Sequence, residues 1–173
     1  MTDARPATRK QLWTIFTLTK QDLRDTPMTV EEAGRIISRA MGEKQAKVEN
    51  WARIWGAAHQ AGIDAGNNRI PVPMIVQQRA NPDDSSPVIK EYEPVMDGVC
   101  GFAWIKIRPA THVFCRWLKK NGIGKTAYGG GLSIWAHEFA QSYERKMAYA
   151  GAAARVIQDR IPELSVYAEG RLD

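Results

Sequence analysis

The chain has 173 residues, of which 44% are hydrophobic and 25% are charged, ordinary values for a folded globular protein. Its two cysteines are too few for the disulfide scaffold of a small secreted protein, and its first ten residues lack the apolar core of a secretion signal. No apolar run approaches the roughly 20 residues needed to cross a bilayer. Composition therefore predicts reduced thiols, a cytoplasmic location and no association with a membrane.

The first part of the chain is predicted to be helical. Thr8 can cap a first helix, and the T-x-x-E capping box that begins at Thr29 starts a second one. Gly42 stands in the position that usually follows the last turn of a helix. We therefore expect residues 1–42 to form an N-terminal helical hairpin module and residues 43–173 to form an α+β domain.

That second part is expected to open with a helix carrying Trp51 and Trp55, after which the hydrophobic period changes from that of helices to that of strands. The predicted order after this helix is βββαβαβ, a mixed or antiparallel sheet with helices largely on one face. The elements are strands at 72–79, 88–95 and 99–108, a helix at 111–121, a strand at 132–136, a helix after Ser142 and a strand at 165–170.

Charge is distributed unevenly along the chain. The segment 98–137 has no carboxylate but contains six basic and six aromatic side chains, whereas the remainder holds 18 Lys and Arg against 19 Asp and Glu. The net charge of +5 therefore belongs to this basic-aromatic segment. Clustered positive charge attracts polyanions, and flat rings stack on bases, so the segment predicts a nucleic-acid surface.

Nine side chains of this segment are the candidate binding residues. Six cations would neutralise phosphates, and three rings would stack on bases or fill a partner's pocket. Because side chains alternate along a strand, four of the nine are expected on one face of the strand at 99–108. An alternative stays open, in which the two rings on that strand are core residues and the lysines merely solvate an edge. The nine are Lys106, Arg108, Arg116, Lys119, Lys120, Lys125, Phe102, Trp104 and Tyr128.

No catalytic signature emerges, and we expect no cofactor or metal. The sequence NGIGKT lacks the first glycine of a phosphate-binding loop, because Lys119 occupies that position. The cysteines and histidines do not have a familiar metal-ligand spacing. Positive charges near Cys115 would favour a thiolate, with His112 one turn away, although a buried cysteine explains the same pattern. A small metal-dependent nuclease, with carboxylates from Asp97 or Glu138, is kept as an alternative.

Two parts of the chain resemble phage proteins. The N-terminal motifs ATRKQLW, LTKQDLR and MTVEEA are similar to a helical module of phage and prophage proteins. The motifs DGVCGFAWIKIRP, WLKKNGIG and YGGGLSIW, within residues 55–173, resemble a phage-borne family of unassigned function. The resemblance implies a gene of a virus or mobile element that acts in a bacterial cytoplasm.

We therefore expect a phage-type, non-enzymatic protein that binds DNA or RNA through its basic-aromatic surface. One alternative is a protein-interaction role, either as an inhibitor of a host nucleic-acid-guided defence complex, similar to anti-CRISPR proteins, or as a virion component. The small nuclease is the second alternative. The sequence does not distinguish DNA from RNA, nor does it give the oligomeric state.

Overall fold

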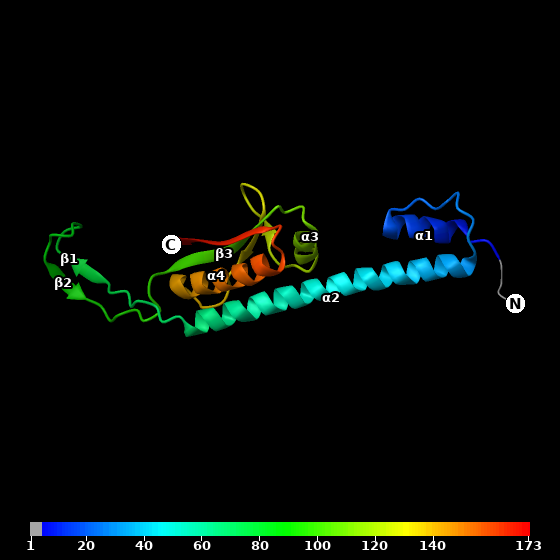
Figure 1. The fold of residues 1–173 in the computed structure, drawn as a ribbon. Coiled ribbons are helices and arrows are strands. Elements are labelled where there is room, and N and C mark those ends of the chain that lie inside the picture. The colour runs from blue at the N-terminus through cyan, green and yellow to red at the C-terminus, as the bar shows by residue number, and fades with distance from the viewer. Residues whose placement is uncertain (1–4) are drawn as a thin grey trace. The chain divides into compact units, whose positions relative to one another are not determined.

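The computed structural model describes residues 5–173, so the first four residues of the predicted N-terminal module lie outside the described part. Contacts divide the chain into two compact units, with the division between Ala52 and Arg53. Helices, two antiparallel sheets and their order confirm the predicted α+β class (Figure 1). The elements are α1 (Arg9–Thr19), α2 (Val30–Asn68), β1 (Gln77–Arg79), β2 (Val88–Glu91), β3 (Gly101–Arg108), α3 (Val113–Lys120), β4 (Lys125–Thr126), β5 (Leu132–Trp135), α4 (Tyr143–Arg160) and β6 (Ser165–Leu172).

Both predicted caps are present in the first unit. The Thr8 hydroxyl accepts a hydrogen bond from the Gln11 amide at 3.2 Å, and the Gln11 side chain accepts one from the Thr8 amide at 3.0 Å. The pair Thr29 and Glu32 forms the same reciprocal box at the start of α2. Ile15 of α1 is fully buried in this unit. Local capping chemistry thus sets where both helices begin.

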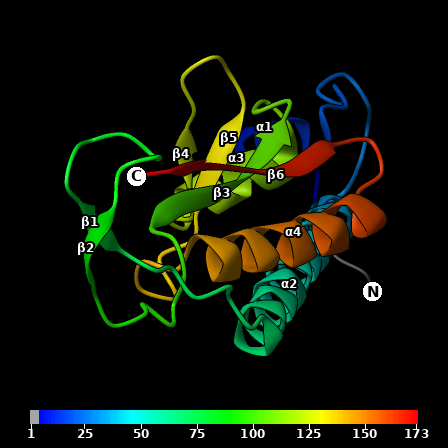
Figure 2. The ribbon, with the colours of Figure 1, turned by 90° about the vertical axis from the view of Figure 1, so that its left-hand side faces the viewer.

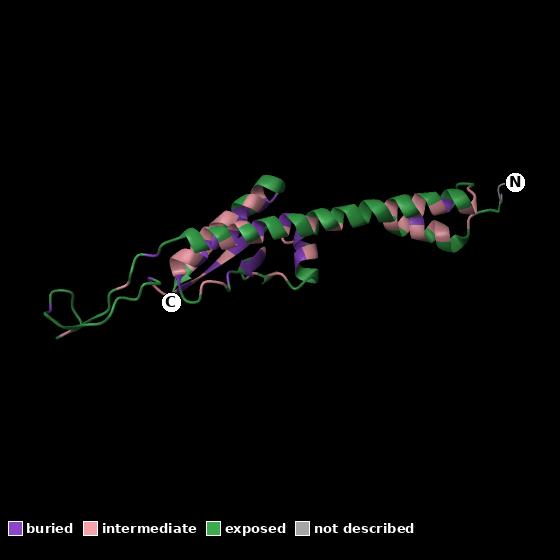
Figure 3. Ribbon diagram, turned by 90° about the horizontal axis from the view of Figure 1, so that it is seen from below, coloured by how far each residue is buried: buried purple, intermediate pink, exposed green. Residues whose placement is uncertain are grey.

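The expected end of the second helix at Gly42 is wrong, because α2 continues to Asn68. Glycine inside a helix costs only about 1 kcal/mol relative to alanine, and the residues after it are good helix formers. Arg39 also bonds Glu43 across this point, with Nε 3.1 Å from the carboxylate. Residues 41–47 are all exposed, as the green ribbon of this stretch shows in Figure 3. The position of a glycine alone therefore did not define a helix end.

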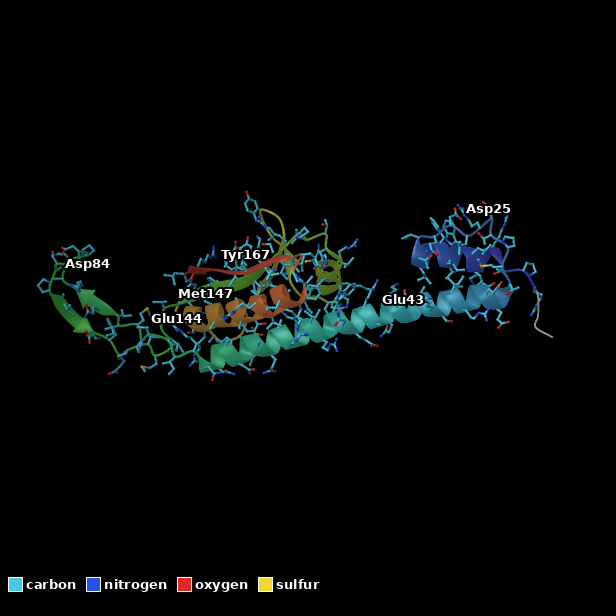
Figure 4. All side chains as sticks on the ribbon, viewed as in Figure 1. Asp25, Glu43, Asp84, Glu144, Met147 and Tyr167 are labelled. Atoms are coloured by element: carbon cyan, nitrogen blue, oxygen red, sulfur yellow. The ribbon has the colours of Figure 1, made fainter. Side chains whose placement is uncertain are left out.

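The larger sheet of the second unit has the order β4-β5-β3-β6. Its ladder pairs Ile105 with Ile134 and Ile107 with Leu132, and all four side chains are buried. α4 packs across β3 and β6 on this face of the sheet (Figure 2). We call the face toward α4 the inner face. Met147 of α4 lies beneath β6, where its sulfur would meet a side chain added at the Gly170 position (Figure 4).

The part of α2 that belongs to the second unit packs closely on aromatic rings. A Cβ atom added to Gly62 would lie 2.6 Å from the ring of Tyr149 in α4. One added to Gly66 would overlap the ring of Phe139. Glycine is required at both positions because the rings occupy the space that any side chain would need.

Strands predicted at 72–79 and 88–95 form only the short β1 and β2, which pair with each other in a separate two-stranded ribbon. Beyond these strands an isolated bridge joins Met74 and Val95, which follow Pro73 and Pro94, and the prolines themselves cannot donate to a ladder. At the base of the ribbon, Glu144 accepts a hydrogen bond from the Val72 amide at 2.9 Å and pairs with Arg69. Figure 4 labels Glu144 at this base and Asp84 at the ribbon's tip.

The ribbon and the segments on either side of it expose an unusual amount of apolar surface. Nine large hydrophobic side chains between residues 70 and 96 are exposed, and Ile70 is the most exposed of them at 86%.

No helix in residues 5–173 is long and apolar enough to cross a membrane. The two-residue strand β4 was not predicted, because a ladder this short leaves no periodic pattern.

Candidate nucleic-acid interface

The face of the larger sheet turned away from α4, which we call the outer face, carries the predicted strand residues. Alternation along β3 buries Ala103, Ile105 and Ile107 toward α4. It directs Phe102, Trp104, Lys106 and Arg108 to the outer face. Phe102 and Trp104 are half-buried there. They project from the side of the sheet opposite α4, and the Lys146 amine of α4 reaches to 5.4 Å from the centre of the Phe102 ring.

Three rings form an aromatic cluster on the outer face. Trp135 of β5 stacks on Trp104, with ring centroids 5.1 Å apart and planes inclined by 26°. Phe102 meets Trp135 edge-on at 5.7 Å. Trp135 is 41% exposed, so the cluster presents ring surface to solvent. Trp135 was not among the predicted binding residues, although it shares the alternation that placed the others.

β6 supplies residues that sequence reasoning missed. The Arg171 guanidinium carbon lies 5.3 Å from the centre of the Phe102 ring, within cation–π distance. Glu169 accepts a 2.7 Å hydrogen bond from Trp104 Nε1, which fixes the indole plane. The sequence does place Glu169 and Arg171 two residues apart, which predicts that they share one face of a strand. It does not show that this strand pairs with β3, because that pairing depends on the tertiary fold.

A glycine-rich loop covers one end of the outer face. Gly129, Gly130 and Gly131 all have φ between 77° and 87°, a backbone region that glycine adopts freely. Lys106 was expected among the exposed cations, but it is 5% exposed, with Nζ 3.5 Å from the Tyr128 carbonyl oxygen. This expectation failed because the loop folds over the strand. The Tyr128 side chain itself is fully exposed.

The remaining predicted cations divide into two groups. Arg108 is exposed and donates to the Gly129 carbonyl at 3.2 Å. Lys119 of α3 donates to the Thr126 hydroxyl at 2.9 Å, which brings it to β4 beside the exposed Lys125. Arg116 and Lys120 are also exposed. Within residues 5–173, no contact joins these last two to the aromatic cluster.

The residues considered for catalysis have the following surroundings in the structure. Burial raises the pKa of the Cys115 thiol to about 11, so nearby positive charge does not make it a thiolate at neutral pH. In the described part of the chain, no group of three or more His, Cys, Asp or Glu side chains is placed to hold a metal ion. Asp97 Oδ1 lies 3.9 Å from Arg145 Nη1.

Comparison of the chain with protein-family models, with curated proteins and with solved structures finds no match. Function must therefore be inferred from the geometry of the chain itself. The outer face combines partly exposed rings, the Arg108 and Arg171 guanidinium groups, the Glu169 carboxylate and a glycine loop. Its rings can stack on planar groups, and its guanidinium groups can attract anions.

Proposed function

We propose that this chain is a non-enzymatic protein that binds nucleic acid, DNA or RNA, through the outer face of its larger sheet. The observation that carries the proposal is the stacked cluster of Trp104, Trp135 and Phe102 on the outer face of the sheet, opposite α4. Bases stack on such rings whatever their sequence, and single strands expose their bases more than duplexes do. A single strand is therefore the better fit.

Cations around the cluster supply the electrostatic part of the proposal. Arg171 lies over Phe102 at one end of the outer face, and Arg108 lies beside the glycine loop at the other. Lys119 and Lys125 continue the positive charge along β4. A strand that crosses the rings would place phosphates near these groups, and affinity would fall as salt rises.

The phage motifs support a proposed setting for this activity. We propose that the chain acts for a phage or prophage inside a bacterial cytoplasm. The exposed apolar side chains of the β1–β2 ribbon favour a second candidate function, a protein-interaction role such as inhibition of a host defence complex. In that case the ribbon would contact the partner protein.

The test is fluorescence anisotropy with labelled single-stranded and double-stranded DNA and RNA, at about 50 and 200 mM salt. We expect single strands to bind more tightly than duplexes, with affinity that falls steeply between the two salt concentrations. Absence of binding at the lower salt would contradict the proposal. Capture of a host complex that survives nuclease treatment would then support the protein-interaction role.

A further inference from the structure

An unpaired stretch of strand edge lies next to the outer face. The Ala136 amide donates to the Ala103 carbonyl at 2.9 Å, so residue 136 directs its main-chain groups toward β3. Main-chain groups alternate in direction along an antiparallel strand, so the N–H and C=O of Trp135 point to the opposite edge. β4 does not reach them, because it pairs only with Leu132 and Ser133.

The chain that precedes β4 turns away from this edge. Continuing the β4–β5 register would place Ile123 opposite Trp135, but the Ile123 amide donates to the Leu118 carbonyl at 2.9 Å instead. Within residues 5–173, no protein group bonds the Trp135 main-chain pair. One donor and one acceptor therefore stand next to each other on an open edge.

This edge opens onto a groove of about 440 Å³, which we call the edge groove. Its lining combines two indoles with polar and charged groups, all within the second unit. The residues that matter for the argument are Trp55, His59, Lys125, Trp135, Glu138 and Tyr149.

Aromatic and polar groups are fixed on the α2 side of the groove. The Trp55 ring stacks against the His59 ring at 5.8 Å, with planes 24° apart. His59 Nδ1 lies 2.7 Å from the Tyr149 hydroxyl. Burial, together with the charge of Glu138, raises the pKa of Tyr149, so this hydroxyl keeps its proton. The groove thus holds a flat ring surface whose orientation is set by a hydrogen-bonded pair.

The edge groove is continuous with the outer face. Trp135 stacks on Trp104 in the outer face and also lines the groove, and Lys125 lies at the border of both. A strand on the outer face can therefore turn one base around this edge. We propose that the edge groove binds a single unstacked nucleobase that carries an exocyclic amine. This inference rests on the proposed function and names its preferred ligand.

The preference for an amine follows from the hydrogen-bonding groups present. Any base that offers a donor next to an acceptor can bond the C=O and N–H of Trp135. Glu138 adds a carboxylate, which only accepts and which pairs with the amino group of cytosine or adenine. Thymine and uracil have no second donor and would direct a carbonyl toward Glu138. Cytosine should therefore bind better than thymine.

The test compares single-stranded oligo-dC with oligo-dT of about twelve nucleotides, because both carry the same charge and have pyrimidine bases. Anisotropy of the full chain should show tighter binding of oligo-dC by on the order of tenfold. Glu138→Gln should abolish this preference mainly by strengthening the binding of oligo-dT, since the amide can donate to a thymine carbonyl as well as accept from a cytosine amine. Glu163→Gln, which makes the same charge change away from the groove, should keep the preference.

Failure of the inference and failure of the proposed function give different results. If the wild type binds neither oligonucleotide at low salt, the proposed function is wrong and the base site is wrong with it. If it binds both equally, or if the two Gln variants behave alike, the base site is wrong while the proposed function stands. In that case the open strand edge at Trp135 would instead suit an extended peptide, which pairs through main-chain groups.

Discussion

The Tyr149 hydroxyl lies 2.7 Å from His59 Nδ1 and joins α4 to α2 within the second unit. Tyr149 is 2% exposed, so water cannot readily replace its hydroxyl. Removal of the hydroxyl would therefore leave the His59 imidazole without this partner. We predict that Tyr149→Phe lowers the free energy of unfolding by about 1–2 kcal/mol. Urea unfolding at neutral pH measures this change, and an unchanged midpoint would contradict it.

The same pair predicts a pH dependence. Burial, and secondarily Glu138, raises the pKa of Tyr149 above its ordinary value of 10 in the folded state. A raised folded pKa gives stabilisation that is complete below about pH 10 and is lost as the pH rises toward the folded pKa. We expect stability to fall more steeply above pH 10 in the wild type than in Tyr149→Phe. Thermal melts of both proteins at a series of pH values measure this, and the melting temperatures of the two proteins should converge above pH 10.

Trp135 should contribute a large share of the free energy of nucleic-acid binding. Its replacement by alanine removes the ring that stacks on Trp104, and stacking on an aromatic side chain contributes about 1–3 kcal/mol per base. Trp135→Ala is expected to weaken binding of oligo-dT by on the order of tenfold in the anisotropy assay. Trp13→Ala is the matched control, since Trp13 is 57% exposed and belongs to the first unit. Equal losses from the two variants would count against the outer face.

The two cysteines should differ in reactivity. Cys115 is fully buried with its pKa raised to about 11, whereas Cys100 is half-buried. We expect a disulfide reagent at about pH 8 to modify one thiol in the native protein and both after denaturation. Cys100→Ala should remove the native reaction, and Cys115→Ala should keep it. Modification of Cys115 in the native protein would contradict the burial of this thiol.

Two glycines of α2 should respond in opposite directions to the same substitution. A Cβ atom at Gly42 meets nothing within 4 Å, so Gly42→Ala should raise helix stability by about 1 kcal/mol. A Cβ atom at Gly62 lies 2.6 Å from the Tyr149 ring, so Gly62→Ala should destabilise the protein. Denaturant unfolding of both variants provides the comparison, and stabilisation by Gly62→Ala would contradict the close packing of α2 on α4.

Local signals accounted for the parts of the fold that were predicted correctly. The capping boxes at Thr8 and Thr29 use side chains three residues apart, and the alternation along β3 needs only one strand. The two errors have different causes, one long-range and one local. Burial of Lys106 depends on a loop that begins some twenty residues later, and α2 passes through Gly42 because its neighbours favour a helix.

The candidate site, too, was predicted only where the signal lay within one strand. The alternation of β3 placed Phe102 and Trp104 on one face, but the contribution of β6 required knowledge of which strands are neighbours. Arg171 and Glu169 lie more than sixty residues from the rings that they contact, so no local pattern linked them. The edge groove also brings together residues from α2, β5 and α4.

Both ends of the β1–β2 ribbon are held at the start of α4. The Val72 amide is bonded by Glu144, and Asp97 faces Arg145 at 3.9 Å. A protease that cuts the exposed tip near Asp84 would therefore produce two fragments that remain associated, since the Val72–Glu144 hydrogen bond and the His59–Tyr149 contact join them. The tip is accordingly the position at which this chain can be interrupted, or extended by an inserted tag, without separating the strands of the larger sheet.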